Sequence, residues 1–246
     1  MSDENPDSPL SPLTVIGTVK SPFREKFGIP RQPGILADIE SDLILKSPFG
    51  TADAFRGLEG FSHLWVSFIF HAVQQEDFTP LVRPPRLGGN TKVGVFATRS
   101  THRPNSLGLS VGKIVSIQHN PKDETSIRVA GLDILNGTPI VDIKPYLGWS
   151  DAVSANESGF AKATPAKTLE VQWSETALRQ ADFLKVKPKE RTTIEAVLAL
   201  DPRPAYHASR PPRPSYGVSL YRYNIRFKID ADAPVCWITE LTRLSE

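Results

Sequence analysis

The chain has 246 residues, of which 39% are hydrophobic, and its 29 Lys and Arg against 27 Asp and Glu give a net charge of +2. These values are typical of a soluble globular protein with one large core or two small ones. No run approaches the roughly 18 apolar residues of a membrane span, and the acidic, proline-bearing start does not resemble a signal peptide, so we expect a cytoplasmic protein. A single cysteine, Cys236, excludes an internal disulfide, and five scattered histidines indicate no metal site.

The first two thirds of the chain predict a mostly β domain at residues 13–150, after a disordered tail at 1–12. Apolar runs of strand length lie at residues 14–19, 43–45, 64–70, 93–97, 107–117, 127–135 and 139–143. The run at 64–70 is nearly continuous, as in a strand buried on both faces. Asn136-Gly137, between two runs, predicts a two-residue hairpin. The 22 prolines favour turns over long helices.

The last third predicts a small α+β domain at residues 165–246, after a linker at 151–164 that is rich in Ser, Ala, Asn and Gly. A strand at 168–173 leads to a helix that Ser174 caps. Thr192 and Glu195 form a capping-box pattern for a second helix, which ends at Asp201-Pro202. Runs at 216–229 and 235–241 predict a closing pair of strands.

The charges are segregated along the chain. Residues 78–122 contain no acid, and their basic residues are Arg83, Arg86, Lys92, Arg99, Arg103, Lys113 and Lys122. Residues 202–229 are also free of acids and interleave basic with aromatic side chains. Because arginine contacts phosphates and aromatic rings stack on bases, the two windows favour a polyanionic ligand such as RNA. The alternative is that these basic side chains only solvate surface loops.

Neither a GxGxxG fingerprint nor a P-loop is present, so a Rossmann-type nucleotide site is not expected. The segments that stand out are IPRQPG at 29–34, RGLEGFSHLW at 56–65, RPPRLGGN at 83–90, GVFATRSTHRPN at 94–105, LDILNGTP at 132–139, VDIKPY at 141–146 and DPRPAY at 201–206. In this order and combination they closely resemble the TrmO family, over residues 13–241.

The resemblance implies an S-adenosylmethionine-dependent tRNA methyltransferase that acts as a homodimer, with a β-barrel catalytic domain in place of a Rossmann sheet. It implies methylation of the exocyclic nitrogen of threonylcarbamoyl-adenosine, next to the anticodon. The chain departs from the family at one position: the family reads His-Arg-Pro-Asn-Pro-Ile-Gly, and Ser106 replaces the second proline here. We expect a looser turn at this position.

The resemblance also assigns residues to ligands. Those placed at the cofactor are Pro30, Arg31, Gln32, His71, Ala72, Arg99, Leu109, Leu132, Asp133, Ile134, Leu135 and Asn136. Arg99 can bind a carboxylate through two hydrogen bonds, and Asp133 can accept one from an ammonium or a ribose hydroxyl. Those predicted to contact RNA are Arg83, Arg86, Arg103, Lys144, Arg203 and Tyr206. No catalytic base is assigned, and the candidates are Asp133, Asp142 and Asp201.

Structural roles are the alternative for several of these residues. The segment 30–33 can be a rigid turn, and His71 at the end of a strand can be structural. Asp201 and Arg203 can pair with each other or with the barrel. Two other functions also stay open. A non-catalytic RNA-binding module would not retain S-adenosylmethionine, whereas a methyltransferase of a non-RNA substrate would act independently of salt.

Overall fold

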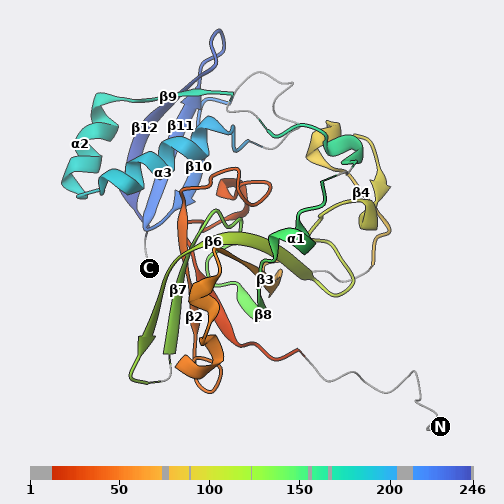
Figure 1. Ribbon diagram of the computed structural model, residues 1–246. Helices are drawn as coiled ribbons and strands as arrows, with labels where there is room; N and C mark the ends of the chain where they lie inside the picture. Colours follow the sequence, from red (N-terminus) through yellow and green to blue (C-terminus); the bar gives the residue numbers. More distant parts are fainter. Residues whose placement is uncertain are drawn as a thin grey trace, which may run out of the picture.

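The computed structural model of the protein describes residues 13–73, 78–88, 90–122, 124–154, 157–165, 168–203 and 213–244. A closed β-barrel carries a smaller sheet with two helices on one of its ends (Figure 1). The predicted fold class, mainly β with an α+β C-terminal part, is therefore confirmed. None of the described helices is long and apolar enough to cross a membrane. The expected tail at 1–12 lies outside the described residues.

Six strands close the barrel in the order β1-β2-β7-β6-β3-β8, and every neighbouring pair is antiparallel. Their bounds are β1 (Gly17–Lys20), β2 (Glu40–Leu45), β3 (His63–Ile69), β6 (Leu107–Asn120), β7 (Glu124–Ala130) and β8 (Pro139–Pro145). β6 pairs with β3 over its first half and with β7 over its second. This one long strand therefore forms part of two walls, and closure leaves the barrel without an unpaired edge strand.

Alternate side chains of each strand fill the barrel interior. In β3, Leu64, Val66 and Phe68 are buried, while the residues between them are half-buried. The prediction that this strand is buried on both faces is wrong, because the outer face of its wall is only partly covered. Gly108 of β6 faces the same interior, where an added Cβ would lie 2.3 Å from the Phe68 ring. Only glycine fits at this position.

The predicted hairpin at Asn136-Gly137 is not formed, since β7 and β8 are not neighbours in the barrel. β7 ends at Ala130, and residues 131–138 run from it to β8 along the end of β1. Gly137 makes a turn there with φ 79° and donates a 2.7 Å hydrogen bond to the Val19 carbonyl. The Asn136 side chain accepts a hydrogen bond from the Ser21 N–H at 3.2 Å. The dipeptide thus fixes a crossing segment in place of a hairpin.

Between β3 and β6 the chain leaves the barrel and forms residues 78–105, which we call the basic lobe (drawn in yellow in Figure 1). Its elements are β4 (Leu81–Val82), η4 (Pro85–Leu87), β5 (Val93–Gly94) and η5 (Val95–Ala97). The strand predicted at 93–97 therefore stops after two residues. A short 3-10 helix follows it, because β5 pairs only with the two residues of β4.

The C-terminal part is a four-stranded sheet in the order β10-β11-β12-β9, covered by two helices. Its elements are β9 (Glu170–Trp173), α2 (Glu175–Phe183), α3 (Pro188–Ala199), β10 (Tyr216–Leu220), β11 (Tyr223–Ile229) and β12 (Val235–Arg243). The run predicted as one strand at 216–229 is two strands. They are joined by a tight turn at Tyr221, which has φ 54°. β9 and β12 are parallel, and the other pairs are antiparallel.

The two helices begin at different kinds of cap. Ser174 caps α2 as predicted, since its hydroxyl accepts a hydrogen bond from the Ala177 N–H at 3.2 Å. The capping box predicted at Thr192 is wrong, because α3 already begins at Pro188. Proline is pre-set for the first turn of a helix, and Glu190 accepts a 2.9 Å hydrogen bond from the Lys187 N–H. Thr192 lies inside the helix, where its hydroxyl donates to the Pro188 carbonyl.

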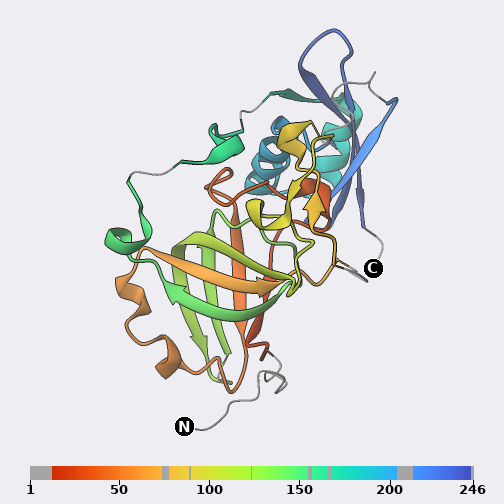
Figure 2. The same ribbon diagram turned by 90° about the vertical axis from the view of Figure 1, so that its right-hand side faces the viewer.

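The barrel and the C-terminal part pack against each other through the segment between β1 and β2 (Figure 2). Phe23, Leu36 and Ile39 of this segment are buried in the C-terminal core. Phe23 also pairs with Leu220 in an isolated β-bridge. Two short helices follow β8: α1 (Gly148–Asp151) ends where the predicted linker begins, and η6 (Gly159–Ala161) lies within that linker. The C-terminal part thus holds the β1–β2 segment at one end of the barrel.

Candidate functional site

Three residues from separate segments meet at this end of the barrel. Gln32 belongs to the β1–β2 segment, Arg99 to the basic lobe, and Asp133 to the segment after β7. The Arg99 guanidinium donates a hydrogen bond from Nη1 to Oε1 of Gln32 at 2.6 Å. Arg99 also lies close enough to Asp133 for its charge to affect that carboxyl. The structure therefore brings together three of the residues predicted at the cofactor.

Asp133 is the group of this site whose environment is most perturbed. Its Oδ1 accepts a 2.6 Å hydrogen bond from the hydroxyl of Ser110, a fully buried residue of β6. Loss of solvent raises the pKa of Asp133, while the Ser110 hydrogen bond and the Arg99 charge oppose this shift. A carboxylate held in this way is a stronger base and a stronger hydrogen-bond acceptor than one in water.

Backbone contacts tie the segments of the site together. The Gly34 N–H donates a 2.8 Å hydrogen bond to the Gly131 carbonyl, which joins the β1–β2 segment to residues 131–136. Leu132 and Ile134 are each 1% exposed and pack in the barrel core, so only their backbone can face a ligand. Pro30 is buried, Gln32 and Leu135 are half-buried, and Arg31 is exposed. Asn136 fixes the crossing segment, as described above.

His71, Ala72 and Leu109 are the remaining residues predicted at the cofactor. The first two are exposed just beyond β3, where the Phe70 N–H donates a 2.8 Å hydrogen bond to the Ser106 carbonyl. Leu109 is 57% exposed. It precedes Ser110 in β6, and successive side chains of a strand point to opposite faces. Its side chain therefore points outward, away from Asp133.

Ser106 lies in a turn that proline could not form. Its φ is 49°, whereas the proline ring fixes φ near −65°. The Ser106 N–H also donates a 3.1 Å hydrogen bond to the Arg103 carbonyl, and proline has no N–H to donate. At the position of the family's proline, this chain thus forms a turn that is closed by a backbone hydrogen bond proline could not make.

The other two candidate bases are neutralised elsewhere in the molecule. Asp142 of β8 pairs with Lys144 on the barrel wall. Asp201 receives two hydrogen bonds from the Arg203 guanidinium, at 2.8 and 2.7 Å, in the C-terminal part. The Arg203 guanidinium also lies 5.8 Å from the ring centre of Tyr216. Asp201 and Arg203 therefore pair with each other, and Tyr206 lies outside the described residues.

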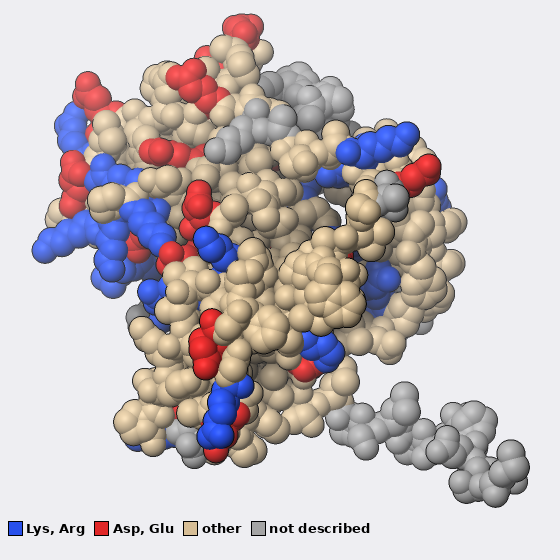
Figure 3. Space-filling model, in the orientation of Figure 1, with Lys and Arg blue, Asp and Glu red and all other residues tan. Residues whose placement is uncertain are grey.

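The two windows without acids differ once they are folded. In the second window, Arg222 pairs with Glu190 at 3.8 Å and Arg226 with Glu240 at 3.5 Å. Basic and acidic side chains lie side by side around α2 and α3 (Figure 3). The second window thus lacks acids in sequence, but Arg222 and Arg226 are compensated in space by acids from outside it. In the first window, Arg86 donates to the Ala163 carbonyl at 2.6 Å and Arg103 to the Thr98 carbonyl at 2.8 Å.

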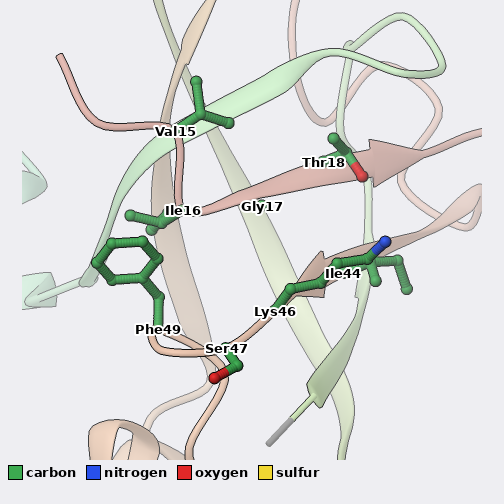
Figure 4. A pocket seen from close by; sticks show the side chains of 8 residues that line it. All are labelled: Val15, Ile16, Gly17, Thr18, Ile44, Lys46, Ser47 and Phe49. Atoms are coloured by element: carbon green, nitrogen blue, oxygen red, sulfur yellow. The ribbon is translucent and has the colours of Figure 1, made fainter. Parts of the chain in front are cut away.

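A hollow of about 210 Å³ lies at the opposite end of the barrel from Asp133 (Figure 4). Its lining residues are Val15, Ile16, Gly17, Thr18, Ile44, Lys46, Ser47 and Phe49. None of these residues is predicted at the cofactor, and Lys46 is their single charged side chain. Within the described ranges, no group of three or more His, Cys, Asp and Glu could hold a metal ion.

Ser110 is a residue of the site that the sequence analysis did not predict. The sequence carries a signal for it, since Ser110 is a polar residue between Gly108 and Gly112 at inward positions of a strand. A buried hydroxyl at such a position needs a partner, which here is Asp133.

The fold and the site define a β-barrel protein with an attached α+β part and a site of opposed charges, Arg99 and Asp133, suited to a zwitterionic ligand. The chain belongs to the tRNA-methyltransferase O (TrmO) family. The model of the family's N-terminal domain matches residues 18–152, and that of its C-terminal domain matches residues 166–244.

Relatives and a solved structure agree with this assignment. The chain is 41% identical over 215 residues to the tRNA (adenine(37)-N6)-methyltransferase of Escherichia coli, covering 87% of this chain and 91% of that protein. It is 42% identical over 217 residues to RcsF of Pseudomonas aeruginosa, again over 87% and 91%, a protein named provisionally as an S-adenosylmethionine-dependent methyltransferase. A crystal structure of TrmO from Pseudomonas aeruginosa superposes with a TM-score of 0.74 at 33% identity, over 95% of this chain and 99% of that one.

Proposed function

We propose that this chain transfers a methyl group from S-adenosylmethionine to the exocyclic nitrogen of threonylcarbamoyl-adenosine next to the anticodon of tRNA. The observation that carries the proposal is the meeting of Gln32, Arg99 and Asp133 at one end of the barrel. The names of the E. coli and P. aeruginosa relatives support the reaction and its cofactor. A tRNA substrate also implies work in the cytoplasm.

The residues present fit the cofactor. Its amino-acid end carries a carboxylate and an ammonium, which need a cation and an anion close together. Arg99 uses one of its five N–H donors on Gln32, so others remain for a carboxylate. Asp133 keeps acceptor capacity beside the Ser110 hydrogen bond for an ammonium or a ribose hydroxyl. Backbone groups of residues 131–136 and the adjoining segment 30–34 are the candidates for the adenine.

The main contribution of the chain to the reaction is alignment. When bound, S-adenosylmethionine supplies the electrophilic methyl group. Arg99 and Asp133 fix the amino-acid end of the cofactor, and the β1–β2 segment and the basic lobe limit the approach of water. The nitrogen that gains the methyl must release its proton. Asp133 is the one of the three candidate bases not paired with a cation in the structure, so it is the candidate to accept that proton, as the alternative to holding the ammonium of the cofactor.

The homodimer is a further part of this proposal, supported by exposed apolar side chains on the outer wall of the barrel. Leu107 and Leu109 of β6 are 39% and 57% exposed, and Trp149 of α1 is 86% exposed. α1 is attached to the same wall, because Trp65 of β3 donates a 2.9 Å hydrogen bond to Asp151. The surface around α1 is largely free of charged side chains (Figure 3). A second copy on this wall would bring Leu109, which points away from its own Asp133, to the partner's site.

The test uses the purified protein, labelled S-adenosylmethionine and tRNA that carries threonylcarbamoyl-adenosine. Mass spectrometry of the digested nucleosides should detect one added methyl on the modified adenosine. Retained RNA binding without bound cofactor would favour the non-catalytic module. Salt-insensitive methylation of an uncharged acceptor in place of tRNA would favour a non-RNA substrate. Light scattering at micromolar concentration should report about twice the chain mass, the simplest two-fold assembly.

A further inference from the structure

The basic lobe carries a second hollow, of about 390 Å³, that the cofactor does not require. It lies between β4 and the loop that follows η5, and its lining includes the side chains of Arg83, Lys92 and His102. These residues come from three separate turns of the lobe, and all three are exposed. The fold therefore places three side chains that can donate N–H hydrogen bonds around one hollow.

The cations of the lobe fall into two groups. Arg86, Arg99 and Arg103 are held by acceptors of the protein itself, as described above. For the side chains of Arg83, Lys92 and His102, by contrast, no acceptor or carboxylate is found among the described residues. The window 78–122 contains no acid, so no carboxylate within it compensates their charge. Cations around a concave space raise the local concentration of anions.

Hydroxyl groups complete the lining. Ser100 and Thr79 both line the hollow. The Ser100 oxygen accepts a 3.2 Å hydrogen bond from the His102 N–H, which leaves its own hydrogen for an acceptor in the hollow. The loop is also braced, because Thr98 accepts a 3.2 Å hydrogen bond from the Ser100 N–H. The Ser100 hydroxyl is thus held in place before a ligand arrives.

The hollow is adjacent to the proposed cofactor site. Arg99 contacts Gln32, whereas its neighbour Ser100 lines the hollow, so one loop serves both. Exposed aromatic rings lie on the same lobe: Phe78 is 52% and Phe96 71% exposed, and their centres are 6.4 Å apart in a stacked arrangement. The Arg103 guanidinium lies over the Phe96 ring, 5.8 Å from its centre. An aromatic platform beside a cationic hollow is the combination that binds single-stranded RNA.

We infer that Arg83, Lys92 and His102 bind an anion of the tRNA substrate beside the methylated nucleotide, while Phe96 stacks on an unpaired base of the anticodon loop. This inference rests on the proposed function. The anion has two possible sources of the same chemistry, a backbone phosphate or the carboxylate of the threonylcarbamoyl group. The assignment extends the tRNA contacts to Lys92, His102 and Phe96, and it gives Arg103 a supporting role in place of direct contact.

The experiment compares Arg83→Ala/Lys92→Ala with Lys122→Ala as the matched control. Lys122 is an exposed cation of the same window, but it lies in the β6–β7 turn, remote from the lobe. The double variant should bind tRNA about tenfold more weakly, and its salt dependence should fall by about one unit for each phosphate that the variant can no longer bind. Lys122→Ala should bind as the wild type does. S-adenosylmethionine affinity should be unchanged in both. Equal tRNA affinity of the double variant and the wild type would overturn the inference.

Two arms separate the sources of the anion. With tRNA that lacks the threonylcarbamoyl group, an undiminished effect of the double variant indicates a phosphate, and loss of the effect indicates the carboxylate. A further readout does not depend on methylation. Titration with inorganic phosphate should shift the His102 ring signals in NMR spectra of the wild type but not of the double variant. A wild type that binds phosphate at His102 but does not methylate tRNA would contradict the proposed function alone, and absence of the shift would contradict the hollow.

Phe96 has its own comparison. Phe96→Ala should raise the KM for tRNA while kcat for bound substrate stays close to the wild-type value, and Phe96→Tyr should restore the KM because tyrosine keeps the ring face. A merely structural role would instead lower thermal stability in Phe96→Ala, with no change in KM for the folded enzyme. That result would remove the stacking platform from the inference.

Discussion

The hydroxyl of Ser110 lies 2.6 Å from Oδ1 of Asp133 and orients a carboxylate whose pKa is raised by burial. The sign of this shift fixes its effect on stability. An acid with a raised pKa binds its proton more tightly in the folded than in the unfolded state. The folded protein therefore loses stability as the pH rises from the ordinary value of 3.8 through the folded pKa, and at neutral pH the ionised carboxylate is destabilising.

Asp133→Asn should therefore raise the Tm at pH 7, because the amide can still accept from Ser110 and carries no charge. The gain over the wild type should shrink as the pH is lowered toward 3.8. Calorimetry across this range measures the effect. A variant that is less stable than the wild type at pH 7 would show that the hydrogen bonds and the Arg99 charge stabilise the ionised carboxylate by more than its burial destabilises it.

The same variant separates two roles of Asp133 in methyl transfer. If the carboxylate accepts the proton, kcat should fall at saturating S-adenosylmethionine. If it only holds the cofactor, the KM for S-adenosylmethionine should rise while kcat is retained. Ser110→Ala leaves the carboxylate in place but removes its orienting hydrogen bond, and it should produce a weaker form of the same change.

Arg99→Ala should weaken binding of S-adenosylmethionine by about 1.5 to 3 kcal/mol, the range for hydrogen bonds to charged groups. The fold should be unaffected, since Arg99 is exposed and its side-chain hydrogen bond is to Gln32. Titration calorimetry gives the dissociation constant, and Lys122→Ala is a control from the same acid-free window. An unchanged constant in Arg99→Ala would remove this arginine from the cofactor site.

The periodicity of the sequence predicts the barrel strands well, but it does not determine which strands are neighbours. The run at 64–70 shows the limit: a nearly continuous apolar segment does not reveal that Trp65 and Ile69 lie on an outer wall. Asn136-Gly137 shows another, because the turn chemistry is satisfied by Gly137 while the flanking strands pair elsewhere. Local patterns specify a turn, and long-range pairing decides what it connects.

The sequence predicts which residues belong to the site from their types and motifs. It does not predict which side chains pair with each other in the folded chain. The resemblance places Arg99, Gln32 and Asp133 at a cofactor, and the structure brings them together. The pairing of Arg203 with Asp201 is one of two alternatives in the sequence, since two residues of opposite charge close in sequence can equally face apart. The compensation of Arg222 by Glu190, 32 positions earlier, has no local signal at all.

Cys236 should be inert in the folded protein. It is fully buried in β12, and burial raises the pKa of its thiol to about 12. Since the thiolate is the reactive form, a thiol reagent such as DTNB should not react at pH 8 until denaturant unfolds the chain, and should then titrate one thiol. Rapid reaction without denaturant would indicate that the C-terminal sheet opens in solution.

Arg203→Ala should destabilise the C-terminal part, because it removes two hydrogen bonds to Asp201 and leaves that carboxylate unpaired. The Arg203 and Asp201 side chains are only 10% and 20% exposed, so solvent compensates this loss poorly. We expect a decrease of about 2 kcal/mol in the free energy of unfolding, within the usual range for a charged hydrogen-bonded group. Denaturant unfolding measures it, with Arg213→Ala as a control because Arg213 is exposed.

The double variant Asp201→Ala/Arg203→Ala should be more stable than the sum of the two single losses predicts, because it removes the unpaired charge together with the pair. The same preparations test the alternative role in RNA recognition. If Arg203 acts only within the fold, the folded fraction of Arg203→Ala should bind tRNA with wild-type affinity and an unchanged salt dependence. A variant that keeps its stability but loses tRNA affinity would instead mean that the ion pair opens and that Arg203 contacts a phosphate when RNA binds.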